Sequence, residues 1–325
     1  MNPVPLKLWL KLPGDGPSEI WTLEPHPEGV DLFHFAPFAA NPDTPNLEIA
    51  GFMRKGASPE PGAVPLQSSM ANIQASKEQH LEVIQKALNE IGAGELEKVV
   101  LSRSEFWESD VPPELVFRSK CETYRDSFVY LMHHPEAGVW MGASPELLLQ
   151  KRGRSYETVS LAGTQKVQAT SWSEKEIHEQ ALVTDFIKEV VKINQAQDVN
   201  VSETHDRTYG VIKHLESRIS FSSEADMFYW LNALHPTPAV GGEPRKEALA
   251  FIAENEIIPR GYYAGYVGWS RGHEADFFVN LRCMRCFRNG YQVFAGGGIV
   301  AGSDPQSEWE ETQAKIATIQ SQWSR

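Results

Sequence analysis

Two predicted helices carry acidic side chains at spacings that suit a metal ion. Near the C-terminus, Glu308, Glu311 and Lys315 follow one another at intervals of three and four residues, which places them on one face of a helix. An earlier predicted helix carries Glu176 and Glu179 three residues apart. Each pair alone is typical of a solvated helix face. If the two helices meet, the four carboxylates would form the hard-oxygen, partly hydrated environment that Mg²⁺ prefers.

Three further charged residues interrupt apolar segments that are predicted to be strands. Lys98 opens the segment KVVLSR, Glu146 opens ELLL, and Arg282 lies within DFFVNLRCMRCF. Solvated strand ends and structural ion pairs account for such residues equally well. If the residues instead face a shared cavity, Lys98 and Glu146 are of the types used as base and acid. The planar fork of Arg282 suits bidentate binding of a carboxylate.

Other motifs carry less chemistry. The glycine-rich segment AGGGIVAGSDP could bind an anion at the following helix N-terminus. It matches neither GxxxxGK[ST] nor GxGxxG, and a tight turn capped by Ser303 or Asp304 explains it as well. Cys283 and Cys286 form a CxxC, but a strand would place them on opposite faces, so we interpret them as core residues. The sequence contains neither GxSxG nor HExxH, which leaves Ser/His/Asp catalysis without support.

The predicted elements are runs of hairpin-like strands separated by helices. Short β-like pieces occupy residues 1–55, and the Pro/Gly/Ser-rich segment 56–69 is the best candidate for an internal boundary. This pattern lacks strict βαβ alternation and predicts an antiparallel-rich α+β domain with helices on the outer faces. Apolar periodicity places the helices at about 76–91, 112–124, 173–197, 206–219, 244–255 and 305–323. Strands are expected at 98–107, 127–134, 138–143, 146–152, 155–163, 262–270, 276–287 and 291–300.

The composition and net charge limit the class of partner that the protein can bind. The 325 residues are 41% apolar and 22% charged, which is enough to bury a full core. A net charge of −13 without any run of Lys or Arg argues against nucleic acid and anionic membranes, and favours a small molecule. An anionic ligand would need local cations or a metal. The N-terminus does not read as a signal peptide, no run of 18 apolar residues exists, and three cysteines cannot form a disulfide framework, so we expect a cytoplasmic location.

Nine motifs occur in a specific order along the chain. They are EKVVLSR, GASPELLL, SLAGTQ, EIHEQALV, ALHPTPAVGG, RGYYAGYVGW, VNLRCM, FAGGGIVAGSDP and EWEETQAK. Together they resemble the chorismate-utilising enzyme family, which comprises isochorismate, salicylate, anthranilate and aminodeoxychorismate synthases. The resemblance is dense over residues 95–320 and implies one α/β domain over 1–325, in which two large antiparallel sheets pack together with helices outside. Residues 1–75 match no such motif and would form a shorter, variable N-terminal portion.

The resemblance also implies a role for each matched residue. Lys98 would be the general base for water, and Glu146 the general acid at the C4 hydroxyl. The metal positions are the two helical pairs, with Glu179 and Glu311 as Mg²⁺ ligands and Glu176 and Glu308 as outer acids that act through water. The positions that match substrate contacts are Gly163, Thr164, His235, Tyr263, Arg282, Gly296 and Lys315.

These matches imply a Mg²⁺-dependent isochorismate synthase, an isomerase that adds water at C2 of chorismate and releases the C4 hydroxyl, reversibly, for menaquinone or siderophore biosynthesis. Lys98 separates the sequence from the ammonia-using branch, so no glutamine amidotransferase subunit is expected, and we expect a monomer or weak dimer. A salicylate synthase keeps the same residues and then eliminates pyruvate. A catalytically inactive chorismate-binding module is the third alternative, against which the intact Lys98, Glu146, Glu179 and Glu311 argue.

Overall fold

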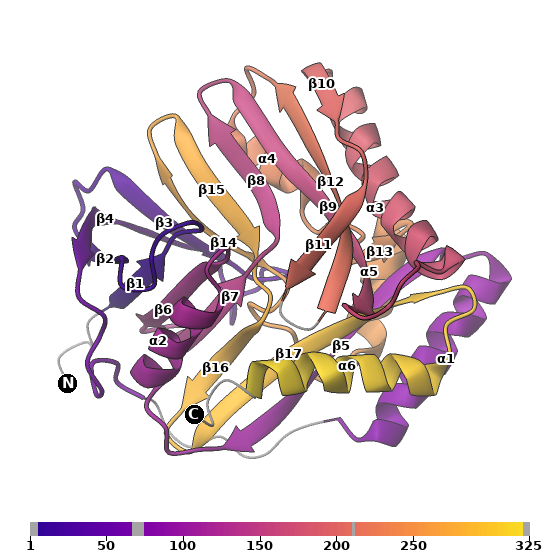
Figure 1. Ribbon diagram of the computed structural model, residues 1–325, viewed down its shortest axis with the longest axis horizontal. Helices are drawn as coiled ribbons and strands as arrows, with labels where there is room; N and C mark the ends of the chain where they lie inside the picture. Colours follow the sequence, from indigo (N-terminus) through magenta and orange to yellow (C-terminus); the bar gives the residue numbers. More distant parts are fainter. Residues whose placement is uncertain (1–5, 67–74, 210–211, 321–325) are drawn as a thin grey trace.

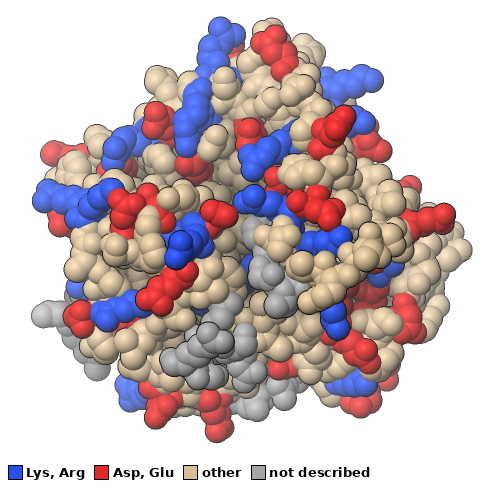
Figure 2. Space-filling model, in the orientation of Figure 1, with Lys and Arg blue, Asp and Glu red and all other residues tan. Residues whose placement is uncertain are grey.

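A computed structural model describes residues 6–66, 75–209 and 212–320 (Figure 1). The expected end of the last helix at 321–323 and the end of the segment 56–69 lie outside these ranges. Within them, no helix combines the length and apolarity needed to cross a membrane. Figure 2 shows acidic and basic side chains interspersed over one face of the molecule.

Strands hold more of the described residues than helices do. The strands are β1 (Lys7–Lys11), β2 (Ile20–Pro25), β3 (Asp31–Ala36), β4 (Leu47–Gly56), β5 (Lys98–Glu108), β6 (Phe128–His134), β7 (Gly138–Ser144), β8 (Leu147–Arg152), β9 (Ser155–Lys166), β10 (Gln197–Val201), β11 (His205–Tyr209), β12 (Ile212–Ser222), β13 (Gly242–Glu243), β14 (Tyr266–Arg271), β15 (Glu274–Val279), β16 (Cys283–Phe287) and β17 (Gly290–Val300). The helices are α1 (Lys77–Ala93), α2 (Pro113–Thr123), α3 (Glu174–Ile193), α4 (Met227–Leu234), α5 (Arg245–Asn255) and α6 (Pro305–Gln320).

The strands pair in an antiparallel ladder that folds back on itself. One half runs β12–β9–β8–β15–β14–β3–β4, and the other runs β2–β1–β6–β7–β16–β17–β5. The pairing of β4 with β2 joins the halves. The expectation of two large, packed antiparallel sheets with outer helices is therefore confirmed, with the two sheets joined at this edge.

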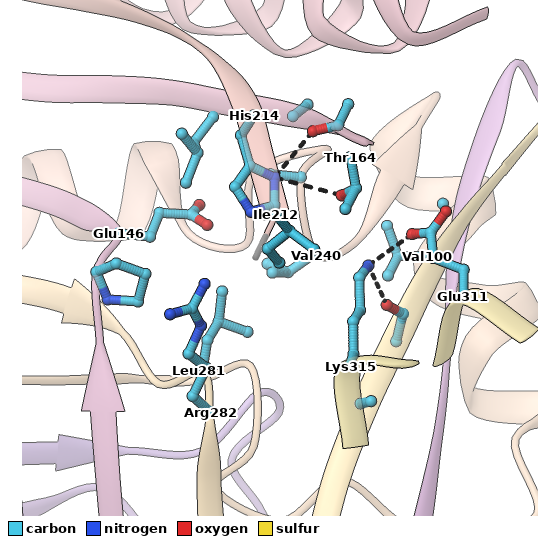
Figure 3. Close-up of a pocket in the computed structure, with 18 of the residues that line it drawn as sticks. Val100, Glu146, Thr164, Ile212, His214, Val240, Leu281, Arg282, Glu311 and Lys315 are labelled. Carbon is cyan, nitrogen blue, oxygen red and sulfur yellow. Dashed lines mark hydrogen bonds and ion pairs between the residues drawn. The ribbon is translucent and has the colours of Figure 1, made fainter. Parts of the chain in front are cut away.

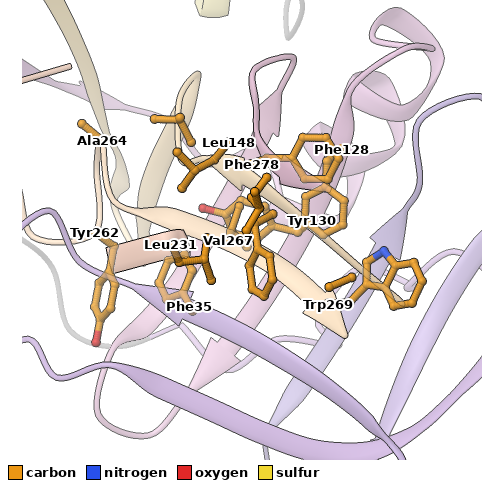
Figure 4. Packing of buried hydrophobic residues seen from close by; sticks show 14 of the residues in the cluster. Phe35, Phe128, Tyr130, Leu148, Leu231, Tyr262, Ala264, Val267, Trp269 and Phe278 are labelled. Atoms are coloured by element: carbon orange, nitrogen blue, oxygen red, sulfur yellow. The ribbon is translucent and has the colours of Figure 1, made fainter. Parts of the chain in front are cut away.

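Aromatic side chains fill the space between the two halves (Figure 4). The ring of Phe128 on β6 stacks on that of Phe278 on β15, with 4.9 Å between centroids. Phe35 on β3 contacts Tyr130 on β6 at 5.7 Å between centroids. Interlocked rings of this size hold both halves in a fixed relation, because interiors pack at crystal-like density.

Helices cover the outer faces (Figure 1). α3 packs on β9 and β12, and α2 packs on β6 and β7. α6 lies along β17, with α1 beside it. α1 begins with a capping box formed by Ser76 and Gln79 and ends at Gly94 in the left-handed conformation, so the predicted boundaries of this helix are close to those observed.

Two predictions about the elements are wrong. The described residues of 206–219 are not a helix, because β11 and β12 pair there as antiparallel strands and β12 pairs with β9 along its length. The segment 276–287 is not one strand, because Arg282 has a φ of 48° in the break between β15 and β16. The helix α4 and the strands β2, β10 and β13 were not predicted. The interpretation of Cys283 and Cys286 as core residues holds, since they lie in different apolar clusters.

Candidate active site

A pocket opens between the two halves of the ladder, under α3 and α6 (Figure 3). The loop before β16 and the ends of β9 and β17 supply its walls. Nine of the thirteen predicted site residues line it: Glu146, Gly163, Thr164, Glu179, Tyr263, Arg282, Gly296, Glu311 and Lys315. The structure thus gathers residues from widely separated motifs at one place. The other four, Lys98, Glu176, Glu308 and His235, do not line the pocket wall.

Glu146 is suited to donate a proton. It is buried at the start of β8, where its backbone carbonyl accepts a hydrogen bond from Val279. Burial raises the pKa of Glu146 to about 8, with the ammonium of Lys98 opposing the shift and Glu216 adding to it. The side chain is therefore a neutral acid at pH 7. Figure 3 shows it on the same side of the pocket as Arg282, opposite Lys315.

Lys98 lies directly behind the pocket at the first position of β5. Its side chain is fully buried, and Nζ lies 3.0 Å from Oε1 of Glu179. Burial raises the pKa of Glu179, but the ammonium groups of Lys98, Lys315 and Lys175 outweigh burial and leave it below its ordinary value. Lys98 therefore reaches the pocket by way of a carboxylate that lines it.

The two helices with acidic pairs come together, and one lysine bridges them. Lys175 on α3 forms an ion pair with Glu308 on α6, and the carboxylate of Glu308 is almost fully buried. Lys315 pairs with Glu311 at 2.8 Å. With the Lys98–Glu179 pair, three carboxylates of the cluster are each balanced by one ammonium. The sequence analysis did not single out Lys175, which lies in the charged first turn of α3.

The fourth carboxylate, Glu176, has a local role. Its Oε2 accepts hydrogen bonds from the Ser173 backbone at 3.1 Å and from Gln165 at 3.2 Å. Ser173 and Glu176 thus form the capping box that begins α3. Glu176 stands near the cluster but is already engaged by amide donors.

The donor set fits a divalent cation. Glu179 and Glu311 both reach the pocket, and β17 approaches them through glycine, since a Cβ on Gly298 would lie 2.3 Å from Oε1 of Glu179. Among the residues that the structure describes, no three acidic, His or Cys side chains converge on one point. Each carboxylate faces a lysine instead, so a cation would take the place of the ammonium groups. The oxygen ligands are those that Mg²⁺ prefers.

Three further side chains of the pocket offer groups for an anion. Arg282 projects from its left-handed backbone position into the pocket. Lys315 donates a hydrogen bond from Nζ to the carbonyl of Gly296 at 2.8 Å. Burial raises the pKa of the Tyr263 phenol, which keeps it protonated beside Gly296. Carboxylates are the ligands that such cations and phenols bind.

His214 on β12 is a pocket residue that the sequence analysis missed. Its Nδ1 lies 2.8 Å from the carbonyl of Gly163 and 3.3 Å from Oγ1 of Thr164. Burial, then Arg282 and Lys315, lower the pKa of His214 to about 3, so the ring is neutral. A neutral ring donates its Nδ1 proton to the Gly163 carbonyl and so holds the 163–164 segment at the pocket wall.

His235 lies outside the pocket. Its ring packs edge-on against Tyr266 and Phe38, with centroids 5.3 and 6.4 Å away. Burial lowers its pKa to about 4. From the same loop, Ala239 and Val240 line the pocket instead.

Comparison with known proteins identifies the family of this chain and several proteins that resemble it. Residues 50–323 match the family model of the chorismate binding enzymes, so the chain belongs to this family. It is 35% identical to the Escherichia coli isochorismate synthase EntC over 207 residues, which are 58% of this chain and 53% of EntC, so the chain spans about half the length of that relative. The vibriobactin-specific isochorismate synthase of Vibrio cholerae is 31% identical over 312 residues, 89% of this chain and 78% of that protein. The structure of the menaquinone-specific isochorismate synthase MenF from Escherichia coli has the same fold, with a TM-score of 0.82 at 23% identity, covering 98% of this chain and 89% of that one.

Proposed function

We propose that this protein is an isochorismate synthase that adds water to C2 of chorismate and releases the C4 hydroxyl. The observation that carries the proposal is the pairing of a buried neutral acid, Glu146, with a buried amine, Lys98, at one anion-binding pocket. The relatives named above support the same reaction. We also propose that residues 1–325 act as one chorismate-binding domain with its core at 95–320.

Substrate binding is the first task of the pocket. Chorismate is a dicarboxylate, and the protein carries a net charge of −13, so the anion must be neutralised locally. Arg282 presents a two-donor fork to one carboxylate. Neutral His214 holds the segment that contains Gly163 and Thr164. The backbone of this segment and the Thr164 hydroxyl face the ring of the bound chorismate.

Two proton transfers then complete the reaction. Lys98 accepts a proton from the water that forms the bond to C2, and Glu146 donates a proton to the C4 oxygen as that bond breaks and the ring double bonds shift. One water enters and one leaves, so the net change is an isomerisation. Nζ of Lys98 lies 3.0 Å from Oε1 of Glu179, so the base stands beside a carboxylate of the pocket.

We further propose that Mg²⁺ binds between α3 and α6. Glu179 and Glu311 would hold it directly, with Glu308 and Glu176 acting through water. When bound, the ion supplies positive charge to the ring carboxylate. The three lysines of the cluster would then be released from their carboxylates, which leaves Lys315 free to face the anion.

The test is to incubate the purified protein with chorismate and Mg²⁺ and to separate the products by chromatography. Isochorismate supports the proposal, and salicylate would identify the lyase alternative. Lys98→Ala should lose about 10²- to 10⁴-fold in kcat, as expected for removal of a general base. Lys98→Arg should be equally inactive, because a guanidinium stays protonated. Near-normal turnover in Lys98→Ala, or efficient amino-product formation with ammonium salts, would rule out water activation by Lys98.

A further inference from the structure

Lys120 is a buried lysine that the proposed reaction does not use. It lies on the inner face of α2, with its side chain fully buried. Its Nζ has no hydrogen-bond partner among the residues that the structure describes, and no ion pair joins it to a described carboxylate. The buried side chains nearest to it along α2 are apolar or thiol-bearing, namely Val116, Phe117 and Cys121, and the buried carboxylate of Glu114 lies six residues away in the first turn.

Lys120 stands directly behind the arginine of the pocket. Its Nζ lies 5.6 Å from the centre of the Tyr124 ring, and the guanidinium carbon of Arg282 lies 5.4 Å from the centre of the same ring. The two cations therefore lie within about 11 Å of each other. Arg282 forms the pocket wall, while Lys120 is wholly within the protein.

The titratable groups that face Lys120 include no carboxylate. They are the thiols of Cys121 on its own helix and of Cys283 and Cys286 on β16, together with Arg282. Burial, followed by Arg282, lowers the pKa of Lys120 to about 8, against the weak opposing effect of the three thiols. The thiols are themselves neutral, since burial raises their pKa values.

A buried cation without a carboxylate partner opposes folding, and a leucine or methionine would fill the space without that cost. A perturbed charge beside a ligand pocket is a candidate for function. Its field reaches the pocket through a low-dielectric interior, where it adds to that of Arg282. A carboxylate bound to Arg282 would cancel the arginine charge and relieve the repulsion on Lys120.

We propose that Lys120 is a positioning residue for the dicarboxylate substrate, a second cation behind Arg282 that takes up a proton when the ligand binds and so strengthens binding. The inference rests on the proposed function. The direction in which the pKa of Lys120 changes on binding follows from the groups that face it. Because Arg282 lowers the pKa of Lys120 in the free protein, its neutralisation raises that pKa. Binding then draws in a proton above about pH 8 and weakens as the pH rises further.

The experiment measures chorismate binding by calorimetry in the Glu146→Gln background, which removes the other group that titrates near pH 8 and blocks turnover. Adding Lys120→Met should weaken binding severalfold at pH 7, because a unit charge about 11 Å from an opposite charge contributes about tenfold at an effective dielectric of about 20 and less at a greater distance. Lys188→Met, which removes a half-exposed lysine paired with Asp185 on α3, should leave binding unchanged.

Proton uptake is the second readout. Binding enthalpies at pH 8.5 in buffers of different ionisation enthalpy should show uptake with Lys120 present and none with Lys120→Met. If chorismate binding to the Glu146→Gln protein shows no proton uptake at pH 8.5, the inference is overturned, whether or not Lys120→Met folds. Equal affinity with and without Lys120→Met would also overturn it. No chorismate binding in any variant would refute the proposed function as well, which distinguishes the two failures.

Discussion

The three consecutive glycines of β17 allow a test of the proposal that Glu179 binds the metal and that Lys98 acts as the base. The test adds a single methyl group through a glycine-to-alanine substitution. Successive residues of a strand face opposite ways, so Gly297 and Gly298 point to different sides. A Cβ on Gly298 would lie 2.3 Å from Oε1 of Glu179 and 3.1 Å from Cε of Lys98. Gly298→Ala therefore pushes on the carboxylate and the amine together while leaving every charge in place.

The size of the effect follows from these distances. An ordinary contact begins at 3.4 Å, so Oε1 of Glu179 must move by about 1 Å, and the Lys98 side chain beside it must shift as well. A displacement of about 1 Å typically costs 10²-fold in rate. We expect kcat/KM to fall about 100-fold. The clash falls on the end of a side chain, so the free energy of unfolding should fall by only about 1 kcal/mol, the low end of overpacking costs.

The matched control is Gly297→Ala. A Cβ there would meet Oε2 of Glu308 and Cγ2 of Thr312 at 3.6 Å, which is ordinary contact. Both variants are assayed for isochorismate formation across a Mg²⁺ titration, with thermal unfolding to confirm the fold. Gly297→Ala should behave like the unmodified protein. Full activity in Gly298→Ala would show that Glu179 and Lys98 do not act where the structure places them, and equal losses in both variants would assign the effect to the strand.

Three further outcomes are expected. The log of kcat/KM should fall above about pH 8, where Glu146 loses the proton that it donates, and this limb should disappear in Glu146→Gln together with most of the activity. Arg282→Lys should lower kcat/KM by at least tenfold, because an ammonium cannot reproduce the planar fork, and an unchanged value would remove Arg282 from the site. Lys175→Met should tighten Mn²⁺ binding in a direct titration by freeing Glu308, whereas Lys188→Met should not, and weaker binding in Lys175→Met would contradict competition between ammonium and metal.

The helices that carry the glutamates could be located from sequence because their spacing matches the helical repeat. Whether they meet could not, since that depends on β17 passing between them with glycines at the contact points. Helical spacing led to a wrong prediction in another segment. Ile212, Leu215 and Ile219 have helical spacing, yet the segment pairs with β9 as a strand. That error hid His214, which no local signal marked as a pocket residue.

Backbone conformation and burial were equally outside the reach of the sequence. Arg282 has a positive φ, a conformation that glycine or asparagine usually marks in a sequence. An apolar segment that reads as one strand therefore contains a break. The charge of Lys175 is ordinary for the first turn of a helix, and only the fold shows that it neutralises a buried carboxylate on another helix. The residues matched by motif were found because their order along the chain carries the information that single positions lack.

The charges of the pocket explain how an acidic protein can bind a dianion. The three lysine–glutamate pairs sum to zero, so they neither attract nor repel the ligand before a metal arrives. Burial keeps Glu146 uncharged at pH 7, which removes the one further negative charge that would face the substrate beside Arg282. Above about pH 8 the ionised carboxylate would both lack the proton needed at C4 and repel the ligand. The alkaline limb should therefore appear in chorismate affinity as well as in kcat, and an affinity that stays constant through pH 9 would show that Glu146 does not face the bound anion.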